Sequence, residues 1–114
     1  LKPSDLIQPY RLEMKTKLKG SHGSDLYAFW GDRITAFLNE SFAASGSNIL
    51  INLASEEYFK AVNLKKLEGI IITPQFKEIK AGKPVTVALF AKRARGLMAH
   101  YAIKNRIATP EGLK

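Results

Sequence analysis

The segment 25–44, DLYAFWGDRITAFLNESFAA, constrains the fold more than any other part of the chain. Its apolar side chains recur at helical spacing and cover a wide arc: Leu26, Tyr27, Trp30, Ile34, Phe37, Leu38 and Phe42. The pattern predicts one heavily buried helix over 25–44, with Gly46 just past its C-terminus. Such a helix has to pack against a sheet or against other helices.

Two flanking segments have the patterns of strands. Residues 10–19, YRLEMKTKLK, alternate strictly along the chain, which predicts a half-buried strand with a basic outer face. Residues 49–54, ILINLA, are short, β-branched and almost wholly apolar, as is typical of a central strand. The sequence GSHGS over 20–24 predicts a flexible turn between the first strand and the helix.

The second half of the chain continues this alternation of strands and helices. Ser55 is expected to cap a short helix that ends near Val62. Residues 68–79 and 83–90 have the pattern of two strands joined by KAGK in a hairpin, and Pro74 predicts an edge position or a bulge.

A last helix is expected over 91–107. The predicted order β-α-β-α-β-β-α defines a mixed α+β fold with a small sheet.

The domain organisation follows from length and from the two ends. At 114 residues the chain is one domain's worth. It opens on Leu1 instead of Met, and its last residues, TPEGLK, resemble the beginning of another helix. We therefore expect residues 1–114 to be a single partial domain, part of a larger single-domain fold.

Several function classes lack the residues that they require. There is no cysteine, which excludes a disulfide, a thiolate nucleophile or a Cys-ligated metal within these residues. His22 and His100 form no zinc motif, and no phosphate-binding glycine loop or nucleophile elbow is present. The longest apolar run, 87–91, is far too short for a membrane span. We expect no metal, no cofactor and no catalytic residue, and a binding protein is favoured over an enzyme.

The positive charge is concentrated at the two ends of the chain. The formal net charge is +8; residues 1–24 carry five Lys or Arg against two acids, and residues 77–114 carry nine against two. Cations gathered in blocks are typical of proteins that bind polyanions, since phosphate contacts use Lys and Arg. The alternative is a solvated basic face without a ligand.

Lys92, Arg93 and Arg95 are the sharpest charge feature. They fall in the first turn of the helix predicted over 91–107, where the helix dipole opposes positive charge. One interpretation is that they surround a phosphate at the helix N-terminus. The other is that they pair with acids elsewhere, for example Glu13 or Glu57.

Two further pairs of residues have both a functional and a structural interpretation. Gly31 and Asp32 interrupt the helix predicted over 25–44, which allows a close approach of a ligand or of another element. Asn52 and Ser55 lie where a strand gives way to a helix, a frequent place for ligand-binding loops. Ser55 can equally be an N-cap and nothing more.

Four blocks, taken together and in order, resemble one protein family. PYRLEM (9–14), LYAFWGD (26–32), INLASEEYFK (51–60) and AKRARGLM (91–98) are similar to the YaaA family of bacterial peroxide stress-response proteins. The resemblance covers nearly the whole chain, and the chain looks like the C-terminal half of the family's longer proteins. The residues that match the family's blocks are Tyr10, Arg11, Glu13, Trp30, Gly31, Asp32, Asn52, Ser55, Glu57, Tyr58, Lys60, Lys92, Arg95 and Gly96.

The resemblance implies a function as well as a fold. It implies a cytoplasmic bacterial protein that limits peroxide damage linked to intracellular iron, and that binds DNA through a basic cleft in an unusual mixed α/β fold. The N-terminal half of the same protein is expected to complete that fold. Arg33 and His100 depart from the family pattern.

Two hypotheses about the site remain open. In the first, phosphates of double-stranded or structured DNA bind, largely without sequence preference, to Arg11, Lys15, Lys17, Lys92, Arg93 and Arg95. In the second, an enzyme or small-molecule pocket is formed by Arg11, Glu13, Asn52, Glu57, Lys92 and Arg95. Convergence of these groups in one concave pocket favours the second hypothesis, whereas a long exposed basic groove favours DNA.

Overall fold

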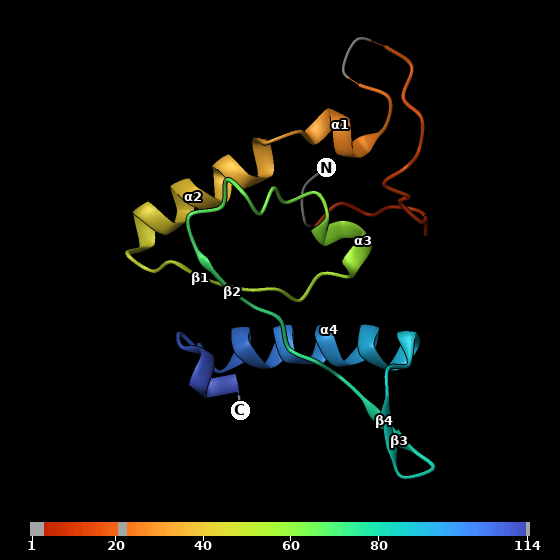
Figure 1. Ribbon diagram of the computed structural model, residues 1–114, viewed down its shortest axis with the longest axis vertical. Helices are drawn as coiled ribbons and strands as arrows, with labels where there is room; N and C mark the ends of the chain where they lie inside the picture. Colours follow the sequence, from red (N-terminus) through yellow and green to blue (C-terminus); the bar gives the residue numbers. More distant parts are fainter. Residues whose placement is uncertain (1–3, 21–22, 114) are drawn as a thin grey trace.

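The computed structural model describes residues 4–20 and 23–113 and has the mixed α+β composition that the sequence predicts. Figure 1 shows the arrangement of the elements. The helices are α1 (Leu26–Trp30), α2 (Arg33–Ser45), α3 (Glu56–Phe59), α4 (Ala88–Lys104) and the 3-10 helix η1 (Pro110–Leu113). The strands are β1 (Ile49–Ile51), β2 (Ile70–Ile72), β3 (Glu78–Lys80) and β4 (Lys83–Val85).

The strands β1 and β2 form a parallel pair, with Leu50 opposite Ile71 at its centre. A parallel pair needs a crossover connection, and here that connection contains α3. The pair lies between α2 and α4 in Figure 1. Phe42 of α2 packs on Gly69 just before β2, so closely that a Cβ on this glycine would lie 2.5 Å from the ring. The strand predicted at 49–54 is confirmed over its first three residues.

The helix predicted over 25–44 is two helices, because the chain turns at Gly31. This residue has φ 49° and ψ −123°, a conformation that glycine adopts without the steric cost of a Cβ. Asp32 then precedes α2, and Gly46 ends α2 in the left-handed conformation, as predicted. The prediction of heavy burial is wrong: Phe37 is 67% exposed, and the buried residue of α2 is Thr35.

The strand predicted over 10–19 is not formed. This segment is irregular, and its backbone groups bond to a helix end and to a side chain instead of to a neighbouring strand. The N–H of Leu26 donates to the Met14 carbonyl at 3.0 Å, and the N–H of Met14 donates to Glu57 Oε1 at 3.2 Å. The alternation of the sequence reflects a single anchoring side chain, Met14, which is 4% exposed. Of the turn predicted over 20–24, residues 21 and 22 lie outside the described residues.

The hairpin is confirmed but is shorter than predicted. Only β3 and β4 take part in it, and Ala81 and Gly82 form its turn with φ of 50° and 75°. The segment 68–79 therefore contains two separate strands, since β2 at its start pairs with β1. Pro74, which has no N–H to donate, lies in the irregular stretch between them.

The helix α4 begins at Ala88, three residues before the predicted start. Val85 ends β4 and Val87 precedes the helix, so the apolar run 87–91 belongs mostly to a helix and not to a strand. In the part of the chain that the structure describes, no helix has both the length and the apolar character needed to cross a membrane.

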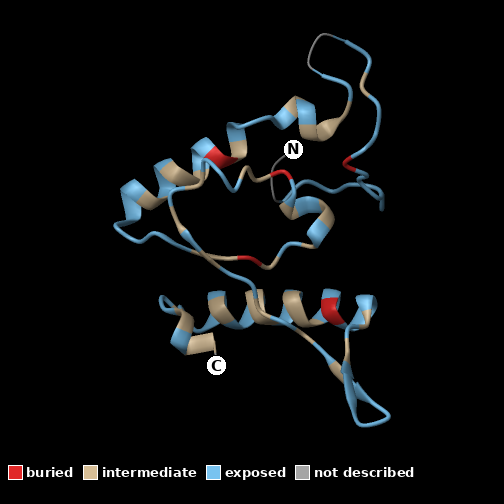
Figure 2. Ribbon diagram, in the orientation of Figure 1, coloured by how far each residue is buried: buried red, intermediate tan, exposed pale blue. Residues whose placement is uncertain are grey.

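Little of the described chain is shielded from solvent (Figure 2). Among the described residues, the apolar side chains that are buried are Met14, Ala61 and Ala91. Large apolar side chains on α4 remain open to solvent, with Leu97 65% and Ile103 79% exposed. Large exposed apolar side chains are typical of a surface that another part of a protein covers.

Candidate anion-binding cleft

The irregular segment 10–16 is held against α3 by hydrogen bonds from both partners. Glu57 Oε1 accepts the N–H of Met14, and the Tyr58 hydroxyl donates to the Leu12 carbonyl at 2.6 Å. The Tyr27 hydroxyl donates to the Glu57 carbonyl, also at 2.6 Å, and ties α1 to the same short helix. These bonds fix the backbone on both sides of Glu13. They therefore also restrict the position from which the Arg11 side chain extends.

Arg11 lies near two carboxylates. Its Nε is 3.9 Å from Glu13 Oε1, and its Nη2 is 4.0 Å from Glu57 Oε2. Both distances are at the long end for an ion pair, and the Arg11 side chain is 77% exposed. Exposed pairs of this kind contribute at most about 1 kcal/mol. The carboxylates therefore orient the guanidinium without saturating its donors.

On α4, Lys92 and Arg95 lie one turn further into the helix than the sequence predicted. Because the helix begins at Ala88, its first turn carries no cation and the charges do not surround the helix N-terminus. The prediction of a phosphate at that N-terminus is therefore wrong. Instead, these cations share one side of the helix with small residues at a spacing of three to four: Ala88, Lys92, Arg95, Gly96 and Ala99.

The N-terminal segment, α3 and α4 together enclose a cleft of about 810 Å³. Arg11 and Glu57 approach it from one side, and Lys92 and Arg95 from α4. The remaining lining is small, apolar or hydroxyl-bearing: Leu53, Ala54, Ser55, Tyr58, Ala88, Leu89, Gly96 and Ala99. Seven residues that match the family blocks thus line one concavity: Arg11, Ser55, Glu57, Tyr58, Lys92, Arg95 and Gly96.

The cations of α4 have no ion-pair partner within residues 4–20 and 23–113. No carboxylate of that part of the chain lies within 4.0 Å of Lys92, Arg93 or Arg95, and Glu13 and Glu57 face Arg11 instead. Pairing with these acids, the alternative suggested by the sequence, is therefore not observed. Lys92 and Arg95 therefore line the cleft without an acidic partner in the described chain.

Two neighbouring hollows place further predicted residues beside the cleft. One of about 500 Å³ shares Arg11 and Glu57 with it and adds Glu13, Lys15 and Lys60. Lys60 is paired with Glu56 at 3.3 Å, one helical turn away. The hydroxyl of Ser55 makes no capping hydrogen bond to α3, although Ser55 holds the N-cap position.

The other hollow, of about 300 Å³, is continuous in its lining with the cleft through Ala54 and Arg95, and it contains Asn52. The amide of Asn52 is already engaged: its Oδ1 accepts the N–H of Ala54 and its Nδ2 donates to Thr73. Asn52 is also 8% exposed, so its role here is to hold the end of β1.

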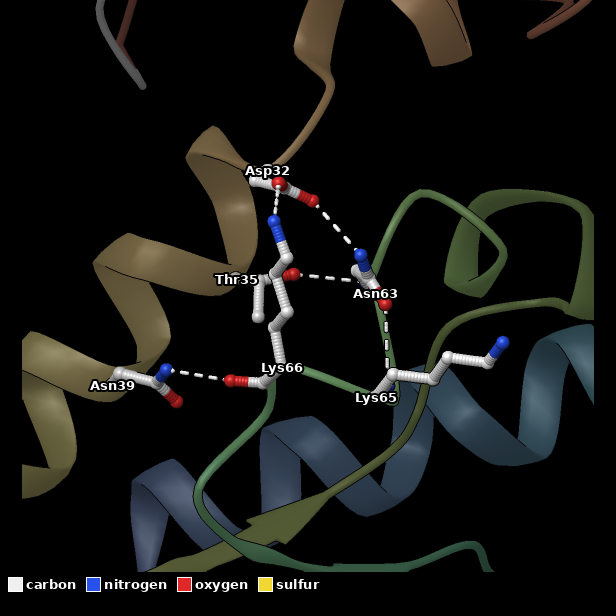
Figure 3. A network of polar contacts seen from close by, with 6 residues as sticks. All are labelled: Asp32, Thr35, Asn39, Asn63, Lys65 and Lys66. Atoms are coloured by element: carbon white, nitrogen blue, oxygen red, sulfur yellow. Dashed lines mark hydrogen bonds and ion pairs between the residues drawn. The ribbon is translucent and has the colours of Figure 1, made fainter.

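Asp32 belongs to a separate polar network with Thr35, Asn39, Asn63 and Lys66, hereafter the Asp32 network (Figure 3). Asp32 accepts hydrogen bonds from Asn63 Nδ2 at 2.9 Å and from Lys66 Nζ at 2.5 Å. These bonds hold the pKa of the Asp32 carboxyl below its ordinary value. Thr35 Oγ1 accepts the N–H of Asn63 at 2.8 Å, and Asn39 bonds the backbone of 66 and 68. The network fastens the segment 63–68 to α2.

Four predicted residues with side chains lie outside the cleft, outside the two neighbouring hollows and outside the Asp32 network. Tyr10 is 67% exposed, and Trp30 packs edge-on against Phe29 with ring centroids 5.4 Å apart. Lys17 and Arg93 are exposed to solvent. Arg93 and Lys17 add to the field around the molecule without lining the cleft.

Sequence reasoning missed part of the lining. Ala88 and Leu89 were assigned to a strand, so their place on the same side of α4 as Lys92 was not recognised. Their spacing of four and three residues from Lys92 is the signal that a correct helix start would have revealed. Among the described residues, no three His, Asp or Glu side chains gather as metal ligands would. His100 is exposed on α4, and His22 lies outside the described residues.

Comparisons with known proteins extend these observations. The family described as peroxide stress protein YaaA matches residues 1–114. A UPF0246 protein of Alteromonas mediterranea is 60% identical over 114 residues, which is 100% of this chain and 44% of that protein. UPF0246 proteins of Tolumonas auensis and Neisseria meningitidis are 58% and 57% identical, and the chain covers 44% of each. The chain thus spans less than half the length of the curated relatives that it matches.

Proposed function

This chain belongs to the YaaA family of peroxide stress proteins, and we propose that within that response it binds DNA through the cleft, in the bacterial cytoplasm. The observation that carries the proposal is the convergence of Arg11, Lys92 and Arg95 on one concavity without matching acids on α4. Because these cations are not neutralised by acids of the described chain, their positive potential attracts an external anion.

The phosphate backbone is the part of DNA that such a surface recognises. Phosphate contacts from Lys and Arg position a nucleic acid without reading its sequence. Lys15, in the hollow beside the cleft, and the exposed Lys17 and Arg93 extend the positive field beyond the cleft itself. Binding is therefore expected to be largely independent of sequence.

The resemblance to the family also motivates a proposal about iron. We propose that the protein lowers oxidative damage that depends on intracellular iron, and that it does so at DNA. A strain without the gene should lose DNA integrity in peroxide, and an intracellular iron chelator should restore it. If the chelator does not restore DNA integrity in that strain, the link to iron is contradicted.

DNA binding is tested by its dependence on salt in the full-length gene product. For wild type, the logarithm of the association constant should fall linearly with the logarithm of salt concentration. Each lost phosphate contact flattens that slope by about 0.9. Lys92→Ala and Arg95→Ala should each produce such a change, measured by fluorescence anisotropy with a labelled duplex.

Lys104→Ala is the matched control, because Lys104 lies on the same helix but outside the lining of the cleft. It should leave the slope nearly unchanged. DNA affinity that does not fall as salt rises, or a Lys104 variant as impaired as the Arg95 variant, would contradict the proposal.

A second candidate function is a small-molecule site, with or without catalysis. The observation that favours it is the shape of the site: Arg11, Ser55, Glu57, Lys92 and Arg95 line one concave cleft instead of a long exposed groove. Glu57 also contributes a carboxylate that a surface made only for phosphates does not need. A small anion that protects the protein against thermal unfolding, where duplex DNA does not, would favour this function.

We also propose that the remainder of the longer family chain covers the exposed apolar side of α4. Leu97 and Tyr101 lie on that side, four residues apart, and few apolar side chains of the described chain are buried. Separately expressed halves should associate, and Leu97→Asp should weaken that association. Residues 1–114 that remain soluble and monomeric and do not bind the other half would contradict this.

A further inference from the structure

The charges that line the cleft match one particular kind of phosphate. Arg11, Lys92 and Arg95 bring three positive charges, and Glu57 brings one negative charge, so the cleft has two net positive charges. We propose that the cleft binds a phosphate monoester, the terminal phosphate of a nucleic acid strand or of a small phosphorylated molecule. This inference rests on the proposed function, because it names the group that the DNA-binding cleft selects.

A monoester fits the site better than a phosphodiester for reasons of charge. A phosphate monoester carries about −1.5 to −2 charges near neutral pH and presents three acceptor oxygens at one point. Each phosphodiester of a strand carries a single charge, and successive charges are spread along the helix. Three cations that converge on one concavity can therefore all act on one monoester, whereas an extended backbone would leave part of their charge unused.

The cations that line the cleft come from separate elements of the fold. The segment that carries Arg11 is held against α3 by hydrogen bonds of its backbone with Glu57 and Tyr58. Lys92 and Arg95 approach from α4, a separate element of the fold. Bidentate guanidinium contacts to phosphate are short and directional, so two arginines on different elements define a position and not merely a field.

Glu57 does not prevent such binding, because its carboxylate is already occupied. Oε1 accepts the N–H of Met14 and Oε2 lies near the Arg11 guanidinium. Ser55 adds a hydroxyl to the lining that makes no capping bond to α3 and can donate to a phosphate oxygen. The small side chains of Ala88, Gly96 and Ala99 leave room for the group between the two sides.

The test compares oligonucleotide duplexes of one sequence that carry either a 5′-phosphate or a 5′-hydroxyl, measured by anisotropy on the full-length gene product. The 5′-phosphate duplex should bind about tenfold more tightly, the effect of roughly one strong charge-assisted contact. Arg95→Ala and Lys92→Ala should abolish the preference, whereas Lys104→Ala should retain it. Circular dichroism of each variant checks that the exposed substitutions leave the fold intact.

A second arm identifies the source of the monoester. A nucleoside monophosphate and the matching nucleoside are titrated as competitors, with inorganic phosphate beside them. Competition by the monophosphate but not by the nucleoside supports the inference and favours a small molecule. No competition, with the 5′-phosphate preference intact, supports it and favours a strand end.

The failures of the two proposals are distinguishable. Equal affinity for both duplexes, together with no competition by the monophosphate, would overturn the monoester site and leave DNA binding standing. If the monophosphate protects the protein against thermal unfolding and the protein has no affinity for DNA, the DNA-binding proposal is overturned and the monoester site stands.

Discussion

The Asp32 network and the cleft differ in whether their charged side chains are paired. In the Asp32 network, the carboxylate of Asp32 meets Lys66 and Asn63, and the Thr35 hydroxyl meets a backbone N–H. In the cleft, Lys92 and Arg95 meet no acid of the described chain. In the first arrangement the charges are paired within the chain, and in the second the charges of Lys92 and Arg95 have no acidic partner among the described residues.

The comparison separates structural from functional motif residues. In the sequence, Asp32 and the cations of the last helix both have a functional and a structural interpretation. In the structure Asp32 attaches a loop to α2, whereas Lys92 and Arg95 have no acidic partner among the described residues. Substitutions in the Asp32 network should therefore change stability, and substitutions in the cleft should change binding.

Thr35→Val should have the largest effect on stability. Thr35 is 2% exposed, and valine fills the same space without the oxygen that accepts the N–H of Asn63. An unsatisfied buried donor costs about 1–3 kcal/mol, so the free energy of unfolding should fall by that amount. Urea unfolding of the full-length protein measures it.

The control for this change is Ser41→Ala on the same helix, where an exposed hydroxyl bonds the Phe37 carbonyl at 2.9 Å. It should cost much less. Thr35→Val should leave the salt slope of DNA binding unchanged, and a flattened slope would mean that the two regions are not separate.

Glu57→Ala should couple to Arg11→Ala, because Glu57 orients the segment that carries Arg11. Coupling between residues in contact amounts to about 0.5–3 kcal/mol. The loss of DNA affinity caused by Arg11→Ala should therefore be smaller in the Glu57→Ala background. Glu57→Gln keeps an oxygen for the Met14 N–H and should preserve part of the coupling. Additive effects in the double variant would show that Glu57 does not position Arg11.

Gly96→Ala should strengthen the fold and weaken binding. A Cβ on Gly96 would meet no described atom within 4 Å, and alanine favours a helix over glycine by about 1 kcal/mol. The added methyl group would, however, project into the cleft. Gly82→Ala, at a φ of 75° in the hairpin turn, should destabilise instead. Unchanged affinity in the Gly96 variant would place the ligand away from this side of α4.

The Asp32 network should lose stability in acid. Because hydrogen bonds hold the pKa of Asp32 below its ordinary value, its contribution is full above that value. The contribution is lost as the pH falls below about 4 and through the lowered pKa. Since Asp32 is exposed, the effect should be the smallest of these. Asp32→Asn should flatten this part of the stability profile between about pH 5 and 2, and an unchanged profile would contradict the assignment.

Local features of the fold, including the hairpin, could be predicted from the sequence, and the pairing of segments distant along the chain could not. The glycines at 46 and 82 mark a helix end and a hairpin turn that their backbone angles confirm. The partner of β1 is not predictable, because the parallel pair joins residues 21 positions apart whose side chains carry no mutual signal. The strand predicted over 10–19 is wrong because alternation of apolar and polar residues indicates one inward side and does not require a neighbouring strand.

The candidate site was predicted in its members and not in its geometry. Arg11, Glu57, Lys92 and Arg95 were expected to converge in the small-molecule hypothesis, and they line one cleft. The helix-terminal phosphate site was wrong because Ala88, Leu89 and Phe90 fit a strand as well as a helix. Asn52, also expected in the pocket, faces Thr73 and the backbone. Only tertiary contacts separate such a structural amide from a ligand-binding one.

The proposals above require that Arg11 and Arg95 act on one bound anion. Arginine side-chain NMR signals of the full-length protein, followed during titration with inorganic phosphate, test it most directly. The signals of Arg11 and Arg95 should shift together with one dissociation constant, whereas those of Arg93 and Arg106 should change little. Independent shifts of Arg11 and Arg95, or equal shifts of all four arginines, would contradict it.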